Sequence, residues 1–162
     1  MALAKEQRER MVETQIAARG IRNERVLKAM RTVPREQFVP PEMHEFAYED
    51  SPLPIEEAQT ISQPYIVALM AESLELEPGD RVLEVGAGSG YAAAVLGQVV
   101  RHVFAIERHE TLARLATERM QRLGYANVTV MCGDGTRGWP EHAPFDAIAV
   151  AAGGPTVPHS LL

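Results

Sequence analysis

A short, mostly apolar run that leads directly into alternating glycines constrains the fold of this chain more than any other feature. Residues 82–85 have the composition of a strand buried on both faces, and Gly86, Gly88 and Gly90 follow it. The alanine-rich residues 92–96 after the glycines have a helical composition. In such a strand–turn–helix unit, backbone N–H groups and a helix N-terminus approach a polar or anionic ligand closely. The segment therefore predicts a ligand-binding turn at the end of a buried strand.

An acidic residue at the end of a second predicted strand indicates what kind of ligand this is. Residues 103–106 are typical of another buried strand, and Glu107 ends it, about 20 residues after the first glycine. A carboxylate at this distance is placed to accept hydrogen bonds from ribose hydroxyls. The glycines and Glu107 together predict a site for a nucleoside cofactor.

The glycine spacing alone leaves the cofactor open. Gly88, Gly90 and Ala93 also fit the dinucleotide pattern, so the spacing does not exclude NAD. Against NAD, a long N-terminal region precedes the glycines and no second nucleotide-binding half follows them. A P-loop is excluded because no Gly-Lys-Ser/Thr follows, and Ser89 lacks the flanking glycines of a hydrolase nucleophile elbow. An ordinary tight turn without a ligand is the remaining alternative.

Composition and charge limit the function classes. The 162 residues, 46% hydrophobic and 23% charged, predict a single domain over residues 1–162 with a substantial core. The net charge of −6 gives no support for nucleic-acid or membrane-surface binding, and no apolar run is long enough to span a membrane. Cys132 is the only cysteine, which favours a reducing cytoplasm. The histidines lack metal-ligand spacing, so no metal site is expected.

Three stretches of different character divide the chain. Residues 5–31 predict two short amphipathic helices, with Gly20 and Asn23 as the caps between them. Residues 33–64 hold more than half of the prolines and predict a long ordered loop. We expect its aromatic side chains to anchor it, namely Phe38, Phe46 and Tyr48.

From residue 64 onward, predicted helices and strands alternate. Helices are expected near residues 64–74, 92–96 and 110–123, and strands at 82–85, 103–106, 128–131 and 145–150. This alternation predicts an α/β fold with a doubly wound parallel sheet, in which ligands bind at the carboxyl ends of the strands.

Three segments resemble the protein-L-isoaspartate O-methyltransferases, a family that uses S-adenosylmethionine. They are Gln-Thr-Ile-Ser-Gln-Pro-Tyr at residues 59–65, the glycine segment at 82–91, and Gly-Asp-Gly-x-x-Gly-Trp at 133–139. The glycine segment is shared by S-adenosylmethionine-dependent methyltransferases of this fold, whereas the other two segments are far more specific. The resemblance runs from about residue 7 to the end and implies a Rossmann-like, three-layer methyltransferase sheet. It also implies that residues 1–63 form part of the substrate side and residues 64–162 the cofactor-binding core.

The resemblance implies transfer of a methyl group from S-adenosyl-L-methionine to the α-carboxylate of an L-isoaspartyl residue in a damaged protein or peptide. The ester then closes to a succinimide, which begins repair. Because a carboxylate is ionised at neutral pH and the sulfonium is already activated, this reaction needs neither a general base nor a metal. Catalysis is expected to come from alignment of the reactants and exclusion of water.

The resemblance also assigns the site residues. Ser62 is the expected catalytic residue that aligns the substrate carboxylate, with helix capping as the alternative. Glu84 is expected near the amino-acid end of the cofactor, Glu107 at the ribose and Asp134 at the adenine. An Asp-Gly turn is the alternative for Asp134, and a plain strand-end residue for Glu84. The expected cofactor-binding residues are Ser62, Gln63, Glu84, Gly86, Gly88, Glu107, Arg108, Asp134 and Gly135. Trp139 is expected in the core.

The resemblance further implies that the family continues beyond the point where this sequence ends. In the expected strand order, residues 147–150 lie at an open edge of the sheet. We therefore expect a fragment of a longer, monomeric protein, or a chain that pairs along this edge and self-associates. Three other functions remain open: methylation of one dedicated peptide, methylation of a nucleic acid or small molecule, and a non-catalytic cofactor-binding module.

Overall fold

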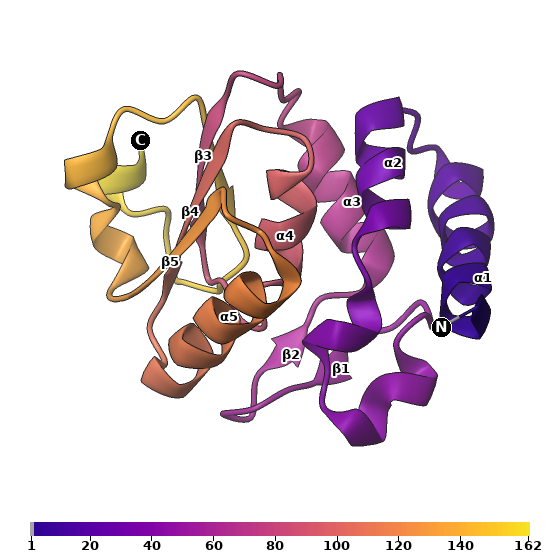
Figure 1. The fold of residues 1–162 in the computed structure, drawn as a ribbon. Coiled ribbons are helices and arrows are strands. Elements are labelled where there is room, and N and C mark those ends of the chain that lie inside the picture. The colour runs from indigo at the N-terminus through magenta and orange to yellow at the C-terminus, as the bar shows by residue number, and fades with distance from the viewer. Residues whose placement is uncertain (1) are drawn as a thin grey trace.

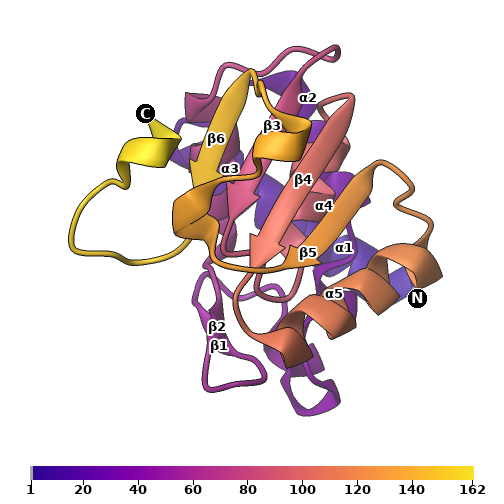
Figure 2. The same cartoon turned by 90° about the vertical axis from the view of Figure 1, so that its left-hand side faces the viewer.

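A parallel sheet of four strands in the order β5–β4–β3–β6 forms the centre of the molecule (Figures 1 and 2). The computed structural model describes residues 2–162. The strands are β3 (Arg81–Val85), β4 (His102–Glu107), β5 (Val128–Cys132) and β6 (Ala147–Val150). Val82 pairs with Val103 on one side and with Ala147 on the other, and all pairs are parallel. The predicted α/β fold with a parallel central sheet is confirmed.

The two faces of the sheet are covered differently. The helices α3 (Pro64–Ser73), α4 (Tyr91–Gly97) and α5 (Glu110–Leu123) contribute to the main core together with Val82, Val103 and Ala105. The opposite face carries a smaller cluster built on Leu83 and Phe104. Short 3₁₀ turns and the expected core residue Trp139 pack against it. No helix in residues 2–162 combines the length and the apolar character that a membrane span requires.

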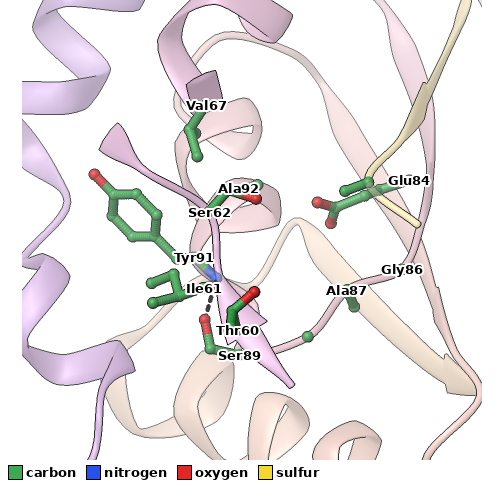
Figure 3. Close-up of a pocket in the computed structure, with 12 residues that line it drawn as sticks. Thr60, Ile61, Ser62, Val67, Glu84, Gly86, Ala87, Ser89, Tyr91 and Ala92 are labelled. Atoms are coloured by element: carbon green, nitrogen blue, oxygen red, sulfur yellow. Dashed lines mark hydrogen bonds between the residues drawn. The ribbon is translucent and has the colours of Figure 1, made fainter. Parts of the chain in front are cut away.

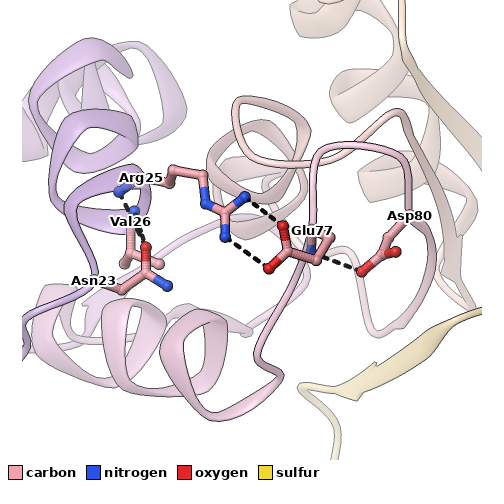
Figure 4. Close-up of polar contacts among 5 residues, drawn as sticks. All are labelled: Asn23, Arg25, Val26, Glu77 and Asp80. Atoms are coloured by element: carbon pink, nitrogen blue, oxygen red, sulfur yellow. Dashed lines mark hydrogen bonds and ion pairs between the residues drawn. The ribbon is translucent and has the colours of Figure 1, made fainter.

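The N-terminal helices begin and end at the predicted caps. Helix α1 (Ala2–Met11) continues through a π turn and a 3₁₀ turn to Gly20, whose φ of +102° is left-handed. Helix α2 (Glu24–Thr32) begins at Asn23, whose side chain accepts hydrogen bonds from the N–H groups of Arg25 and Val26 (Figure 4). Both caps depend only on neighbouring residues, which explains why the sequence predicts them.

An ion pair joins α2 to the loop that precedes β3. Both terminal nitrogens of Arg25 donate to the carboxylate of Glu77, at 2.8 and 3.0 Å (Figure 4). The N–H of Glu77 in turn donates to Asp80 at 2.8 Å. Hydrogen bonding to Arg25 lowers the pKa of the Glu77 carboxyl, so the ionised carboxylate is favoured. The contact places the N-terminal helices beside the entry to the central strand.

The proline-rich stretch is ordered, and it contains a small hairpin of β1 (Leu53–Pro54) and β2 (Thr60–Ile61). Phe38 and Tyr48 are buried as predicted, and the ring of Phe38 meets that of Tyr91 edge-on at 5.5 Å. The prediction that Phe46 is an anchor is wrong. Phe46 is 36% exposed, and the 3₁₀ turn that carries it, Pro41–Phe46, contains no buried residue.

Candidate functional site

A pocket lies between the carboxyl end of β3 and the β1–β2 hairpin (Figure 3). Residues 86–89 of the glycine turn form one wall, and residues 60–62 of the hairpin and its exit form the other. The carboxyl of Glu84 projects from β3 toward Ser62 and Ala92 (Figure 3). The pocket thus forms at the strand end at which the sequence predicts a ligand site.

The glycines of the turn serve two different purposes. All three have positive φ, +92° at Gly86, +55° at Gly88 and +88° at Gly90, a region that other residues rarely adopt. A Cβ atom at Gly86 would lie 3.1 Å from the backbone of Ala151, and one at Gly90 would lie 2.6 Å from the Cε of Met120. At Gly88 the nearest atom would be 3.7 Å away. The absence of a side chain at Gly86 and Gly90 therefore lets other segments of the protein pack against the turn. Of the three glycines, only Gly88 has open surroundings.

Most N–H groups of the turn are engaged within the protein. Those of Gly86 and Ala87 donate to the carbonyl of Ile106 at 2.8 and 3.1 Å, and that of Gly90 donates to the carbonyl of Ala87. The N–H groups of Gly86 and Gly90 are therefore not free to donate to a ligand, and the role of Gly86 in cofactor binding stays a prediction. The turn supplies a close backbone surface, with most of its amides already satisfied.

Glu107 fixes the glycine turn to the end of β4. Its side chain is 5% exposed, and Oε2 accepts from the N–H of Gly88 at 2.8 Å, while Oε1 accepts from the N–H of His109 at 2.9 Å. Each carboxylate oxygen keeps a further lone pair. The structure therefore gives Glu107 a structural role beside the predicted one at the ribose, which stays a prediction.

Glu84 is the most unusual group in the site. It is fully buried, and neither carboxyl oxygen has a hydrogen-bond partner among the described residues. Burial raises the pKa of Glu84 to about 8, and the nearby carboxylate of Glu107 adds to this shift. An unpaired buried carboxyl is costly for folding, and such groups cluster at functional sites. Complete burial argues against the alternative of a plain strand-end residue.

Ser62 lies in the hairpin-side wall and is half-buried. Helix α3 begins behind it at Pro64, and no side chain caps this helix, so the capping alternative for Ser62 is not observed. The predicted role of Ser62 in aligning the substrate stays a prediction. Gln63 is directed elsewhere, because its side-chain amide donates to Asp50 at 2.9 Å.

The predicted residues on β4 and β5 lie outside this pocket. Asp134 is exposed, and its Oδ1 accepts from both the hydroxyl and the N–H of Thr136, which lowers the pKa of its carboxyl. This is the geometry of the Asp-Gly turn alternative. A Cβ at Gly135 would lie 2.4 Å from Val85, so Gly135 permits close approach to β3. Arg108 is exposed at the end of β4.

Two buried residues beside the pocket were not predicted as functional. Tyr91 lines the pocket from the start of α4, and the guanidinium of Arg35 lies 4.9 Å from its ring centre. Arg35 is fully buried, which lowers its pKa, and only its Nε has a partner, the carbonyl of Ala47. The sequence gives no signal for Arg35, because a single arginine between prolines is typical of an exposed loop.

Comparisons with known proteins agree on one family. A family model described as Protein-L-isoaspartate(D-aspartate) O-methyltransferase (PCMT) matches residues 6–162. The chain is 63% identical over 155 residues to Protein-L-isoaspartate O-methyltransferase 2 of Pelobacter propionicus, covering 96% of this chain and 69% of that protein. The family that the three sequence segments predict is thereby confirmed.

Solved structures show the same likeness. A protein-L-isoaspartate O-methyltransferase, 36% identical, superposes with a TM-score of 0.86 over 94% of this chain and 50% of its own. A crystal structure from Plasmodium falciparum, described as a protein of this kind in complex with S-adenosyl-L-homocysteine, is 27% identical with a TM-score of 0.80. It is matched over 95% of this chain and 77% of its own. The chain thus spans half to about three quarters of these solved chains.

Proposed function

Because this chain belongs to the protein-L-isoaspartate(D-aspartate) O-methyltransferase family, we propose that it transfers a methyl group from S-adenosyl-L-methionine to the α-carboxylate of L-isoaspartyl residues in damaged proteins or peptides. The product ester would close to a succinimide and so begin repair. Its exposed, unpaired Cys132 favours a reducing compartment such as the cytoplasm for this work.

The buried carboxyl of Glu84 is the observation that carries the proposal. It projects into the pocket with both oxygens unpartnered, and it lies at the end of the central strand beside the glycine turn. A ligand that brings a cationic amine would satisfy these oxygens and favour the ionised carboxylate. S-adenosylmethionine carries such an amine, so the residues present fit this cofactor.

The remaining cofactor contacts follow from the surrounding strand ends. Glu107 would accept from ribose hydroxyls with its free lone pairs, while its bonds to Gly88 and His109 keep the turn in place. Asp134, Gly135 and Arg108 lie at the carboxyl ends of β5 and β4, the edge of the sheet at which the adenine side of the site is proposed. Gln63 would contribute through its backbone, because its side chain bonds Asp50.

The chain's own part in the reaction is positioning. When bound, S-adenosylmethionine supplies an activated methyl group. Because the substrate carboxylate is already ionised at neutral pH, no side chain has to act as a base. The hydroxyl of Ser62 would donate a hydrogen bond to the substrate carboxylate and fix its direction. Residues 1–63 would form the substrate side, and the hairpin would keep water from the reacting atoms.

A methyl-transfer assay tests the proposal. Purified protein with S-adenosylmethionine should methylate a peptide that contains L-isoaspartate, and it should leave the matched normal-aspartate peptide unmodified. Calorimetry on the same preparation should detect binding of S-adenosylhomocysteine without peptide. Binding without turnover would favour a non-catalytic module, whereas binding of NAD but not of S-adenosylhomocysteine would refute the cofactor.

A further inference from the structure

One side chain from α5 contacts both the glycine turn, which forms one wall of the pocket, and the hairpin, whose exit forms the other. Arg119 donates from Nη1 to the carbonyl oxygen of Ser89 in the glycine turn, at 3.3 Å. Its Nη2 contacts the carboxylate of Glu56 in the hairpin, at 3.4 Å. The side chain of Arg119 is only 11% exposed, so water screens these contacts less than it screens the other ion pairs of the molecule.

Helix α5 is a firm support for this contact. Ala116 lies three residues before Arg119 and four before Met120, so it is a neighbour of both side chains on the helix surface. A Cβ at Gly90 would lie 3.3 Å from the Cβ of Ala116 and 2.6 Å from the Cε of Met120. The helix therefore packs directly on the backbone of the glycine turn, and Arg119 extends from this packed face to the hairpin.

The hairpin, in contrast, has little stability of its own. Its strands pair only at Leu53 with Ile61 and at Pro54 with Thr60, and an isolated pair of strands is marginal even when it is longer. Its turn holds Glu57 and Ala58 at φ of +58° and +51°, which is unfavourable for residues other than glycine. Contacts from the rest of the protein must therefore hold the hairpin in place.

The hairpin is anchored in the core by Leu53, Ile55 and Ile61, and Glu56 adds an ion pair to α5. One carboxylate oxygen of Glu56 contacts Arg119, and the other is buried without a partner. Loss of the guanidinium would leave a partly buried carboxylate without its counter-charge. The neighbouring Ile55 lies against Gly88, since its Cδ1 would be 3.7 Å from a Cβ placed there. Glu56 and Ile55 thus join the hairpin to the glycine turn.

We infer that Arg119 is a positioning residue, which keeps the hairpin closed on the glycine turn and so retains the nucleoside cofactor between the two walls. It acts through Glu56 and Ser89 and makes no contact with the ligand. Because residues 60–62 belong to the hairpin side of the pocket, opening of the hairpin would widen the pocket. The inference rests on the proposed function, since it assumes that this pocket takes the cofactor.

The test compares Arg119→Met with Arg114→Met as a matched control. Arg114 lies on the same helix and pairs with Glu118, but both side chains are more than half exposed. We expect Arg119→Met to weaken S-adenosylhomocysteine binding about tenfold, through faster dissociation. The KM for S-adenosylmethionine should rise by the same factor, with kcat retained at saturation. Arg114→Met should change neither.

A second variant and a local probe keep the test decisive. Glu56→Gln removes the charge that Arg119 contacts without altering α5, and it should add little to the effect of Arg119→Met in the double variant. Hydrogen exchange at the N–H of Ile55, which donates to Gln59 at 2.9 Å, should speed up in both variants. If Arg119→Met does not fold, Glu56→Gln alone decides.

The outcomes distinguish a failure of the proposed function from a failure of the role of Arg119. A wild-type protein that does not bind S-adenosylhomocysteine contradicts the proposed function. A wild type that binds, together with a folded Arg119→Met or Glu56→Gln protein of equal affinity and unchanged exchange at Ile55, overturns the role of Arg119.

Discussion

The ends of the two central strands, β3 and β4, each bury a glutamate, and the two are treated in opposite ways. Glu107 on β4 has both oxygens bonded by backbone N–H groups, whereas neither oxygen of Glu84 on β3 has a partner within residues 2–162. The first arrangement builds the turn that borders the pocket. The second leaves two buried carboxyl oxygens at the pocket that can accept hydrogen bonds. Of two buried carboxyls in adjacent strands, the satisfied one supports the structure and the unsatisfied one is available to a ligand.

Replacement of Glu107 is expected to have the largest effect. Glu107→Ala removes both acceptors and leaves two N–H groups without their partners, so the free energy of unfolding should fall by roughly 3 kcal/mol. Binding of S-adenosylhomocysteine should also weaken by about 1–3 kcal/mol. Urea denaturation and calorimetry measure the two, with the exposed Glu110→Ala as control. Unchanged stability would show that the turn does not depend on this carboxylate.

Replacement of Glu84 should raise the free energy of unfolding, whereas replacement of Glu107 lowers it. The gain should appear only at higher pH. Its folded-state pKa of about 8 exceeds the unfolded value, so the folded protein holds a proton that the unfolded chain releases. Wild-type stability should therefore fall as pH rises from about 5 to 8, by roughly 2–4 kcal/mol from this group.

Glu84→Gln keeps the shape and removes the titration. The variant should be more stable than wild type at pH 8.5 and similar to it at pH 5, while S-adenosylhomocysteine binds it about tenfold more weakly. Urea denaturation at the two pH values provides the measurement. Parallel stability curves for both proteins would contradict the assignment of an unpaired, buried carboxyl.

Replacement of Ser62 should have the smallest and most specific effect. Because no side chain caps α3, Ser62→Ala should leave the free energy of unfolding within about 0.5 kcal/mol of wild type. Turnover of the isoaspartyl peptide should fall about tenfold, with unchanged affinity for S-adenosylhomocysteine. Ser73→Ala, at the far end of the same helix, is the control. Loss of stability without loss of turnover would favour a purely structural role.

The sequence predicts the fold well wherever the cause is local. Gly20 and Asn23 act as caps in the structure as expected, and helix α5 covers the predicted residues 110–123. Each of these features depends on a few neighbouring residues, and the alternating apolar runs then specify the sheet. The sequence also predicts the glycine turn, but close approach to a ligand is only part of the reason for Gly86 and Gly90. Their contacts with Ala151 and Met120 come from distant parts of the chain.

The features that the sequence could not predict depend on tertiary contacts. Phe38 and Phe46 look equivalent in the sequence, yet only Phe38 faces Tyr91 in the core. Arg119 resembles any charged residue on a helix surface, and its role emerges only where α5 meets the hairpin. Likewise, the isolation of Glu84 depends on the absence of donors from every neighbouring segment, which no local pattern encodes.

The proton balance of ligand binding tests the central claim most directly. Calorimetry of S-adenosylhomocysteine binding at pH 7, in buffers of different ionisation enthalpy, counts the protons exchanged. Because Glu84 is protonated in the free protein at this pH and is expected to ionise beside the ligand's amine, nearly one proton should be released per ligand. The release should vanish in Glu84→Gln and above about pH 9. Tight binding without proton release in the wild type would contradict the assignment of Glu84 to the cofactor.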